Sequence, residues 1–238
     1  MSPLSLPELR EQVWRANQAL VRAGLVTLSF GNASGVDREA GVLIIKPSGL
    51  PYDQLLPEHL VAVSLEDGHV VEGELRPSSD TPTHLALYRR YPEIGGVVHT
   101  HSTAATAWAQ AGRSIPPLGT THADHFHGPV PVTRLLREAE VAGAYEHETG
   151  AVIIETLEKL GLSAAEMPAV LVASHGPFTW GHDAEDATAN ATVLEAVATM
   201  ARQTFALNPD AQPIASYLSE RHYRRKHGPN AYYGQKTR

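Results

Sequence analysis

The chain has 238 residues, 42% hydrophobic and 19% charged, which is enough apolar material for a folded core and excludes a disordered chain. Its formal net charge of −7 gives it no overall attraction for nucleic acid or anionic lipid, so neither is expected as a partner. It contains no cysteine, which excludes disulfides and thiolate metal ligands.

The first predicted element is an amphipathic helix near the N-terminus. Ser5 and Glu8 form the pattern of a capping box. Apolar residues then recur at helical spacing, at Leu9, Val13, Ala16 and Leu20. Charged residues interrupt this stretch, so it is not a signal peptide, and no run of about 18 apolar residues follows anywhere. We therefore expect no membrane span and a cytoplasmic location.

Strand and helix patterns follow in irregular alternation. Short β-branched runs bounded by Gly, Pro or charged residues predict strands over 42–45, 60–65, 94–99 and 169–173. Helical patterns begin at Asp80, run from Thr149 to Leu160 before Gly161, and run from Asp183 to about Ala206. There is no internal repeat, low-complexity linker or clear boundary. We expect a single α/β domain over residues 1–238.

The C-terminal segment, about residues 221–238, is rich in Lys, Arg and Tyr and has little apolar periodicity. It can be a solvated basic end of the chain. It can equally be a segment that folds over an anionic site and contributes to it.

Two histidines two positions apart, His99 and His101, end one predicted strand. Alternate residues of a strand share a face, so both rings can point at one ion. His175 follows another predicted strand in the same way, which suggests a shared site of three imidazoles. Three nitrogen ligands suit Zn²⁺ and leave Mn²⁺, Fe²⁺ or Co²⁺ open, with Asp80 as a fourth ligand. Unrelated surface histidines explain the isolated pair equally well.

A second group of histidines, His122, His125 and His127, lies among Gly and Pro residues without a strand pattern. It is a rival metal site with a less constrained geometry. Asp124, within this group, is a candidate acid/base residue. Helix or turn capping is the other interpretation of its side chain.

Three small polar clusters, at residues 31–34, 46–49 and 77–80, are each a turn signal when taken alone. Together they offer hydroxyls, backbone N–H groups and one lysine, which are the groups that bind a phosphate. The chain has neither a dinucleotide-binding glycine motif nor a P-loop nor a nucleophile-elbow serine. No NAD is therefore expected.

In this order, the clusters resemble the class II aldolase and epimerase family. The matching stretches cover nearly the whole chain, at residues 26–32, 45–49, 76–84, 95–102, 119–124, 174–178 and 225–235. The segments 121–124 and 231–235 point to the sugar-phosphate 4-epimerases of that family. The resemblance implies a central, mostly antiparallel β-sheet flanked by helices. It also implies a homotetramer of fourfold cyclic symmetry with sites at subunit interfaces.

The resemblance further implies roles for individual residues. Those matched to the zinc site are Asp80, His99, His101 and His175. Those matched to substrate and phosphate binding are Gly31, Asn32, Lys46, Ser48, Gly49, Ser78, Ser79, Thr120, Glu146 and His222. Asp124 and Tyr233 match the acid/base pair, and the tyrosine comes from the neighbouring chain. His125 and His127 stand where relatives favour Tyr, which leaves the positioning of the Asp124 loop open.

The implied activity is an isomerase reaction, the metal-dependent interconversion of L-ribulose 5-phosphate and D-xylulose 5-phosphate. C4 of this ketose is not adjacent to the carbonyl, so its hydrogen is not acidic, and transient oxidation would need a nicotinamide. Retro-aldol cleavage of the C3–C4 bond and re-addition is the remaining route. A divalent ion would stabilise the resulting enediolate as a Lewis acid. The pathway, arabinose or ascorbate breakdown for instance, stays open.

Two alternatives remain. One is an aldolase of the same family that cleaves a deoxyhexulose 1-phosphate, although such enzymes commonly carry Glu where Asp80 stands. The other is a non-catalytic metal-binding module, which explains the histidines but neither the phosphate loops nor the pair Asp124 and Tyr233.

Overall fold

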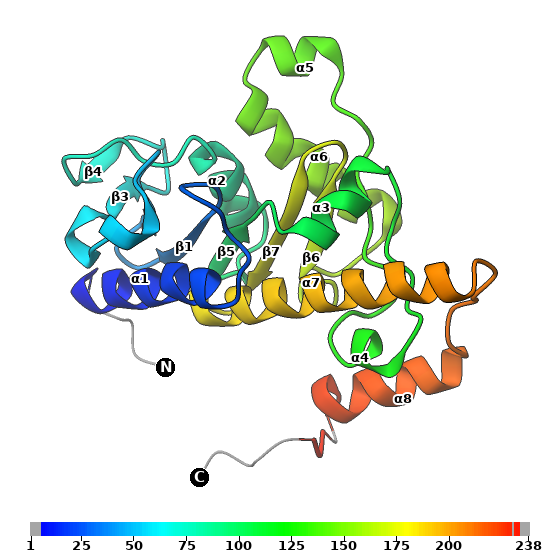
Figure 1. The fold of residues 1–238 in the computed structure, drawn as a ribbon. Helices are drawn as coiled ribbons and strands as arrows, with labels where there is room; N and C mark the ends of the chain where they lie inside the picture. The colour runs from blue at the N-terminus through cyan, green and yellow to red at the C-terminus, as the bar shows by residue number, and fades with distance from the viewer. Residues whose placement is uncertain (1–5, 230, 234–238) are drawn as a thin grey trace.

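Seven strands form one sheet in a computed structural model of the chain, which describes residues 6–229 and 231–233 (Figure 1). The strands are β1 (Asn32–Asp37), β2 (Val42–Ile45), β3 (Val61–Ser64), β4 (Val70–Glu72), β5 (Gly96–His99), β6 (Ala169–Val172) and β7 (Gly176–Gly181). Their order is β4-β3-β2-β1-β5-β7-β6, and every neighbouring pair is antiparallel. The expected α/β fold with a mostly antiparallel sheet is confirmed.

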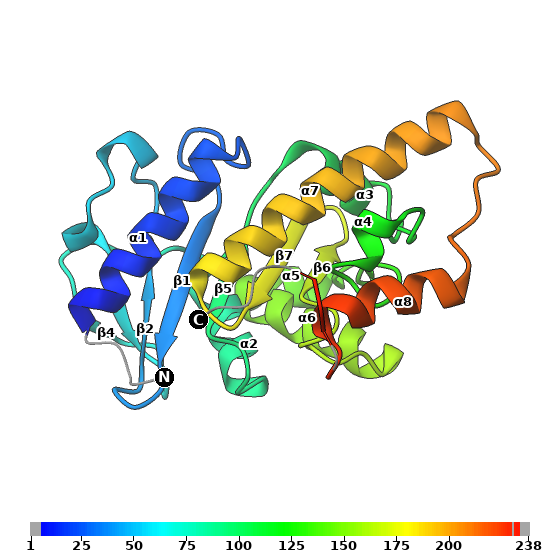
Figure 2. The ribbon, with the colours of Figure 1, turned by 90° about the horizontal axis from the view of Figure 1, so that it is seen from below.

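Helices cover both faces of this sheet. They are α1 (Leu6–Arg22), α2 (Thr81–Arg90), α3 (Thr103–Gln110), α4 (Thr120–Ala123), α5 (Glu138–Ala142), α6 (Tyr145–Leu160), α7 (Ala184–Leu207) and α8 (Ser216–His227), with 3-10 turns η1 (Tyr52–Gln54) and η2 (Pro57–His59) before β3. Helices α1 and α7 lie across one face, as the view from below shows (Figure 2), whereas α2 and α6 lie on the other. Ser5, the predicted N-cap of α1, lies outside the described residues.

The period-two geometry of β2 and β5 divides their side chains between two apolar clusters. In β2, Leu43 and Ile45 belong to the apolar cluster that includes α2 and α6, whereas Ile44 belongs to the cluster around α1. In β5, Val97 and Val98 divide between the two clusters in the same way. Because both faces are covered, β2 is apolar throughout rather than alternately polar.

The long predicted elements are confirmed with small shifts at their ends. The predicted strands are β2, β3, β5 and β6. Asp80 occupies the N-cap position of α2, and the carboxylate of Asp183 caps α7. Helix α6 begins at Tyr145 rather than at Thr149, and it ends at Leu160 with Gly161 as its C-cap, whose φ of 63° is left-handed.

The prediction of a turn at residues 31–34 is wrong, except at its first residue. Gly31 has a left-handed φ of 77°, and a Cβ at this position would lie 2.8 Å from the carbonyl oxygen of His99. Asn32 then begins β1 and pairs with His99 across the ladder. The sequence of β1, NASGVD, lacks the β-branched pattern from which strands are predicted.

The basic C-terminal segment is more regular than its sequence predicts. Residues 221–227 complete helix α8, which packs against α4 and not against the sheet. Its last turn carries four basic residues at the negative end of the helix dipole. Residues 230 and 234–238 lie outside the described part of the chain.

Candidate metal centre and adjoining cavity

Three histidine side chains converge at one end of the central strands. His99 is the last residue of β5, His101 follows two positions later, and His175 directly precedes β7, which pairs with β5. Potential ligand atoms of the three rings all lie within 4.8 Å of one another, and the Nε2 atoms of His99 and His101 are 3.0 Å apart. Among residues 6–229 and 231–233, no other group of His, Asp and Glu is spaced to hold a metal ion.

The turn between β6 and β7 aims His175 at the other two rings. Ser174 has a left-handed φ of 59°, which is uncommon for a residue with a Cβ. Gly176 leaves room on the other side, because a Cβ there would lie 2.7 Å from the carbonyl oxygen of Thr100 and 3.5 Å from the His99 ring. The backbone conformation on both sides of His175 thus brings this ring close to His99.

Hydrogen bonding and burial keep the rings in the form that binds a metal. Nδ1 of His99 lies 3.0 Å from the carbonyl oxygen of Pro177, so Nδ1 carries the hydrogen and Nε2 the free lone pair. Burial, reinforced by the two neighbouring imidazoles, lowers the pKa of His175 to about 4. Burial also lowers the pKa of His101. Both rings are therefore neutral at pH 7, as a divalent ion requires.

Asp80 stands beside the three rings without belonging to their cluster. Nδ2 of Asn32 donates to Oδ2 of Asp80 at 2.7 Å and to Oγ of Ser78 at 2.9 Å. Burial opposes ionisation of this carboxyl, but attraction to the His99 and His84 imidazoles and the bond from Asn32 outweigh it and lower the pKa of Asp80. The result is an oriented carboxylate at the edge of the metal site.

A cavity of about 300 Å³ opens directly onto the three rings. It is lined by Ser29, Phe30, Gly31, Asn32, Lys46, Pro47, Ser48, Gly49, Ser78, Ser79, Asp80, His99, His101, Tyr145, Glu146 and His175. The four metal-site residues and eight of the ten substrate-binding residues implied by the resemblance are in this set. Strand β1, the loop after β2, the N-terminus of α2, β5 and the β6–β7 turn supply most of the wall.

Lys46 is the one Lys or Arg that the structure places in the wall of this cavity. Its side chain is almost fully buried, with Nζ 3.3 Å from the carbonyl oxygens of Ser29 and Pro47 and 4.7 Å from the centre of the Tyr52 ring. Burial lowers its pKa to about 8. Within the described residues no carboxylate pairs with Lys46, so the ammonium is available to an anion.

Thr120, Asp124, His222 and Tyr233, which the resemblance also implicates, do not line the cavity. They lie around α4 and α8, beneath the C-terminal half of α7 (Figure 1); we call this region the α4–α8 corner. The site residues that the resemblance implies therefore lie in two separate places within one chain.

Within the α4–α8 corner, side chains of α8 hold Asp124. Arg225 donates to both of its carboxylate oxygens, at 2.8 and 2.5 Å, and Nδ1 of His222 lies 3.0 Å from Oδ1. Nε2 of His227 lies 2.9 Å from the backbone oxygen of Asp124. Burial opposes ionisation of Asp124, but the bonds from Arg225 and His222 outweigh it and lower its pKa.

The rival histidine group is not arranged as a metal site. The Nε2 atoms of its rings approach different partners: a backbone oxygen of Gly128 for His122, Lys226 for His125, and Glu220 for His127. These rings hold the Asp124 loop to its surroundings.

Sequence reasoning did not assign Tyr145, Phe30 or Arg225 to the site. Tyr145 and Phe30 are in the cavity wall, and the Tyr145 hydroxyl lies 3.2 Å from Nδ1 of His175. The available signals were the position of Tyr145 next to Glu146 and that of Phe30 within the matched stretch 26–32. Arg225 lies in the matched C-terminal stretch, for which the resemblance gives this arginine no role.

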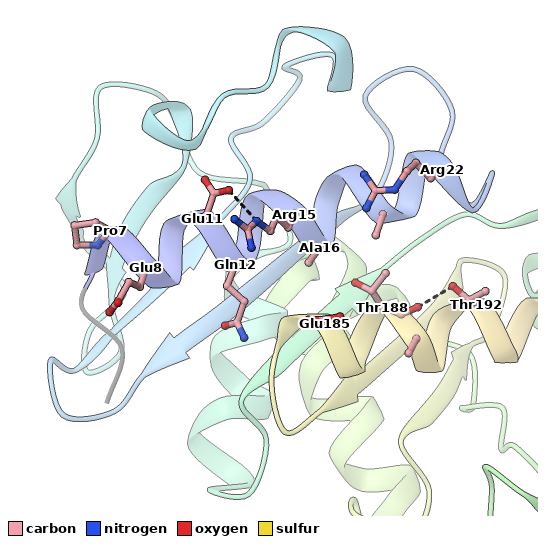
Figure 3. Close-up of a pocket in the computed structure, with 12 residues that line it drawn as sticks. Pro7, Glu8, Glu11, Gln12, Arg15, Ala16, Arg22, Glu185, Thr188 and Thr192 are labelled. Atoms are coloured by element: carbon pink, nitrogen blue, oxygen red, sulfur yellow. Dashed lines mark hydrogen bonds and ion pairs between the residues drawn. The ribbon is translucent and has the colours of Figure 1, made fainter. Parts of the chain in front are cut away.

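A larger hollow of about 860 Å³ lies between α1 and α7 (Figure 3). Its wall contains no histidine, and Glu11 there pairs with Arg15 at 2.8 Å. Among the described residues, the carboxylates of this wall form no group spaced to hold a metal ion, so the smaller cavity at the three rings is the candidate site. None of the helices in the described part of the chain is long and apolar enough to cross a membrane.

Comparison with known proteins gives matches over most of the chain. Residues 11–202 match the family described as the class II aldolase and adducin N-terminal domain. The chain is 57% identical over 231 residues to the L-ribulose-5-phosphate 4-epimerase UlaF of Salmonella paratyphi A (strain ATCC 9150 / SARB42), covering 97% of this chain and 100% of that protein. The protein of the same name from Salmonella typhi has the same identity and coverage.

Solved structures of sugar-phosphate aldolases share the fold. An L-fuculose 1-phosphate aldolase superposes with a TM-score of 0.78 at 22% identity, covering 94% of this chain and 97% of that chain. L-fuculose-1-phosphate aldolase from Thermus thermophilus gives a TM-score of 0.67 at 24% identity, covering 85% of this chain and 97% of that chain. At these identities the likeness concerns the fold alone.

Removal of one imidazole should strongly weaken metal binding. His101→Asn and His175→Asn should each weaken binding of Zn²⁺ by more than the roughly 10–100-fold that loss of an outer-shell partner costs. Metal content after dialysis, measured by plasma mass spectrometry, tests this. His182→Asn, at an exposed histidine paired with Asp186, is the matched control and should keep its metal. Normal metal content in His175→Asn would contradict the site.

Binding of an anion in the cavity should weaken as pH rises. Lys46 is a cation below its pKa of about 8 and loses its charge above it, whereas sulfate keeps its charge over this range. Sulfate affinity of the metal-free protein should fall by about tenfold between pH 7 and 9.5 at constant ionic strength. Lys46→Met should bind sulfate weakly at both values, and exposed Lys159→Met should behave as wild type. A pH-independent wild-type affinity would contradict this role.

Proposed function

The chain belongs to the class II aldolase and adducin N-terminal domain family, and from this we propose that it is a metal-dependent isomerase, an epimerase that interconverts L-ribulose 5-phosphate and D-xylulose 5-phosphate. The observation that carries the proposal is one cavity in which three imidazoles, a buried lysine and serine-rich loops converge. The similarity to proteins named as this epimerase, over almost the whole chain, supports the reaction.

The proposed resident metal is one divalent ion per chain, Zn²⁺ in the first place, with Mn²⁺ and Co²⁺ also suited to three imidazole donors. Bound there, it would supply a Lewis acid for the oxygens at C2 and C3 of the sugar. His99 is held in the tautomer that leaves Nε2 free, and Asn32 fixes the neighbouring Asp80. These bonds prepare the donors before any substrate arrives.

The proposed phosphate anchor is the wall around Lys46. The residues assigned to it and to the sugar beside it are Gly31, Asn32, Lys46, Ser48, Gly49, Ser78, Ser79 and Glu146, all of which line the cavity. Retro-aldol cleavage leaves glycolaldehyde phosphate, which must turn over its carbonyl face before the C3–C4 bond re-forms. A firm hold on the phosphate keeps this fragment in place, because its loss would convert an epimerase into an aldolase.

The proposed acid/base pair is Asp124 and Tyr233, one on each face of the aldehyde, with Thr120 and His222 beside them. The C4 hydroxyl gives its proton to one group as the C3–C4 bond breaks. After re-addition the C4 alkoxide takes a proton from the other group, and exchange with water restores the pair. Since this pair lies off the cavity of its own chain, we propose that the α4–α8 corner of a neighbouring copy completes each site in a homotetramer of fourfold cyclic symmetry.

We assign this activity to the cytoplasm and to carbohydrate breakdown, with arabinose and ascorbate catabolism as routes that would supply the substrate. A second candidate is an aldolase that cleaves a deoxyhexulose 1-phosphate, which the fold shared with L-fuculose 1-phosphate aldolase favours. The two differ in whether the carbon fragments are released.

The purified protein should convert L-ribulose 5-phosphate to D-xylulose 5-phosphate, lose this activity with a chelator and regain it with Zn²⁺. Tyr233→Phe should lower turnover by about 10²–10⁴-fold, because it removes a proton donor, with unchanged metal content. Tyr217→Phe, at a tyrosine of α8 that is 80% exposed, is the control. Accumulation of dihydroxyacetone without D-xylulose 5-phosphate would show an aldolase instead.

A further inference from the structure

Arg225, near the end of α8, touches both members of the proposed acid/base pair. Its guanidinium donates through Nε to Oδ1 and through Nη2 to Oδ2 of Asp124. The same group lies over the ring of Tyr233, 4.5 Å from its centre. The backbone oxygen of Arg225 also accepts hydrogen bonds from the N–H groups of Tyr232 and Tyr233, at 2.9 and 3.1 Å. One residue thus holds a carboxylate and an aromatic ring that are 109 positions apart (233 − 124) in the sequence.

The geometry of these contacts restricts both partners. Two parallel N–H bonds fix the plane of the Asp124 carboxylate, which a single bond would leave free to rotate. Stacking on a guanidinium and two backbone bonds fix the direction in which Tyr233 leaves the end of α8. His222 takes one more lone pair of the Asp124 carboxylate. A carboxylate has about four such sites, so one stays available for a substrate hydroxyl.

We propose that Arg225 is a positioning residue that holds Asp124 and Tyr233 in one fixed arrangement, so that the two groups reach the substrate as a unit. This inference rests on the proposed epimerase function and deepens it. Arg225 does not contact the reacting atoms; it acts through the two residues that do. Lysine cannot replace it, because an ammonium neither binds both carboxylate oxygens in one plane nor stacks in the same way on a ring.

The arrangement also assigns a starting charge to Asp124. The charged and titratable groups that face it are His222, Arg225 and His227 from α8, and His125 from its own loop, with Lys226 bonded to His125. All of these are cationic or neutral, and none is an acid. With Arg225 present, Asp124 is ionised at neutral pH and begins as the proton acceptor. Without Arg225, ionisation should require a higher pH.

The test compares Arg225→Gln and Arg225→Lys with Arg224→Lys, a control at an exposed residue that pairs with Glu220. Arg225→Gln should lower kcat by about 10²-fold with little change in KM, and should move the acidic limb of the kcat profile up by about one pH unit. Arg225→Lys keeps the charge, so its acidic limb should lie close to the wild-type pH. Its kcat should nevertheless stay almost as low as that of Arg225→Gln. Metal content and oligomeric state should match the wild type in all three.

A second measurement does not depend on turnover. The ¹³Cγ resonance of Asp124, identified by its loss in Asp124→Asn, should titrate at a higher pH in Arg225→Gln than in the wild type. An unchanged titration, or near-normal kcat in Arg225→Gln, would overturn the positioning role. Wild-type protein inactive on L-ribulose 5-phosphate would instead refute the proposed function, while the titration would still decide the role of Arg225.

Discussion

The antiparallel pairing of β5 with β7 determines where the three imidazoles meet. His99 lies opposite Phe178 in this ladder, and the two rings stack with centres 4.2 Å apart. Pro177, one position earlier, accepts the hydrogen bond that fixes the His99 tautomer, and His175 precedes the strand itself. A slip of one residue would turn every side chain of β5 to the other face of the sheet. The candidate metal donors are therefore positioned by the strand register, and the cavity opens onto them.

Charge is divided between the cavity and the α4–α8 corner in a way that suits the proposed reaction. In the cavity wall, Lys46 is the cation that we propose as the phosphate anchor, while Asp80 is held next to the three rings. In the corner, Arg225 neutralises Asp124, and hydrogen bonds from Arg225 and His222 orient it. Each acid is thus tied to a specific donor before substrate binds, which is the preorganisation that catalysis by positioned groups requires.

The sequence predicts those parts of the fold and site that depend on local pattern. Apolar β-branched runs identify strands such as β2 and β6, and histidines at two strand ends identify the candidate metal donors, because these signals lie within a few residues of one another. Strand β1 was not predicted because its buried Asn and Ser side chains are polar. Hydrogen bonds satisfy these side chains beneath the covering helices, so the strand shows no hydrophobic pattern. The bonds between Arg225 and Asp124 could not be predicted either, since a contact 101 residues apart follows from how α8 packs on α4.

The claim that each site combines the cavity of one copy with the α4–α8 corner of another is tested most directly by mixing two inactive chains. His99→Asn lacks the metal site and Tyr233→Phe lacks a proton donor, and each should be nearly inactive alone. Co-expressed in equal amounts with different tags, they should form mixed tetramers with roughly a quarter of wild-type activity, because random assembly pairs an intact cavity with an intact corner at that frequency. Mixed tetramers with no recovered activity would contradict the account. That result is expected if each site forms within one chain, because every chain then carries one of the two inactivating substitutions.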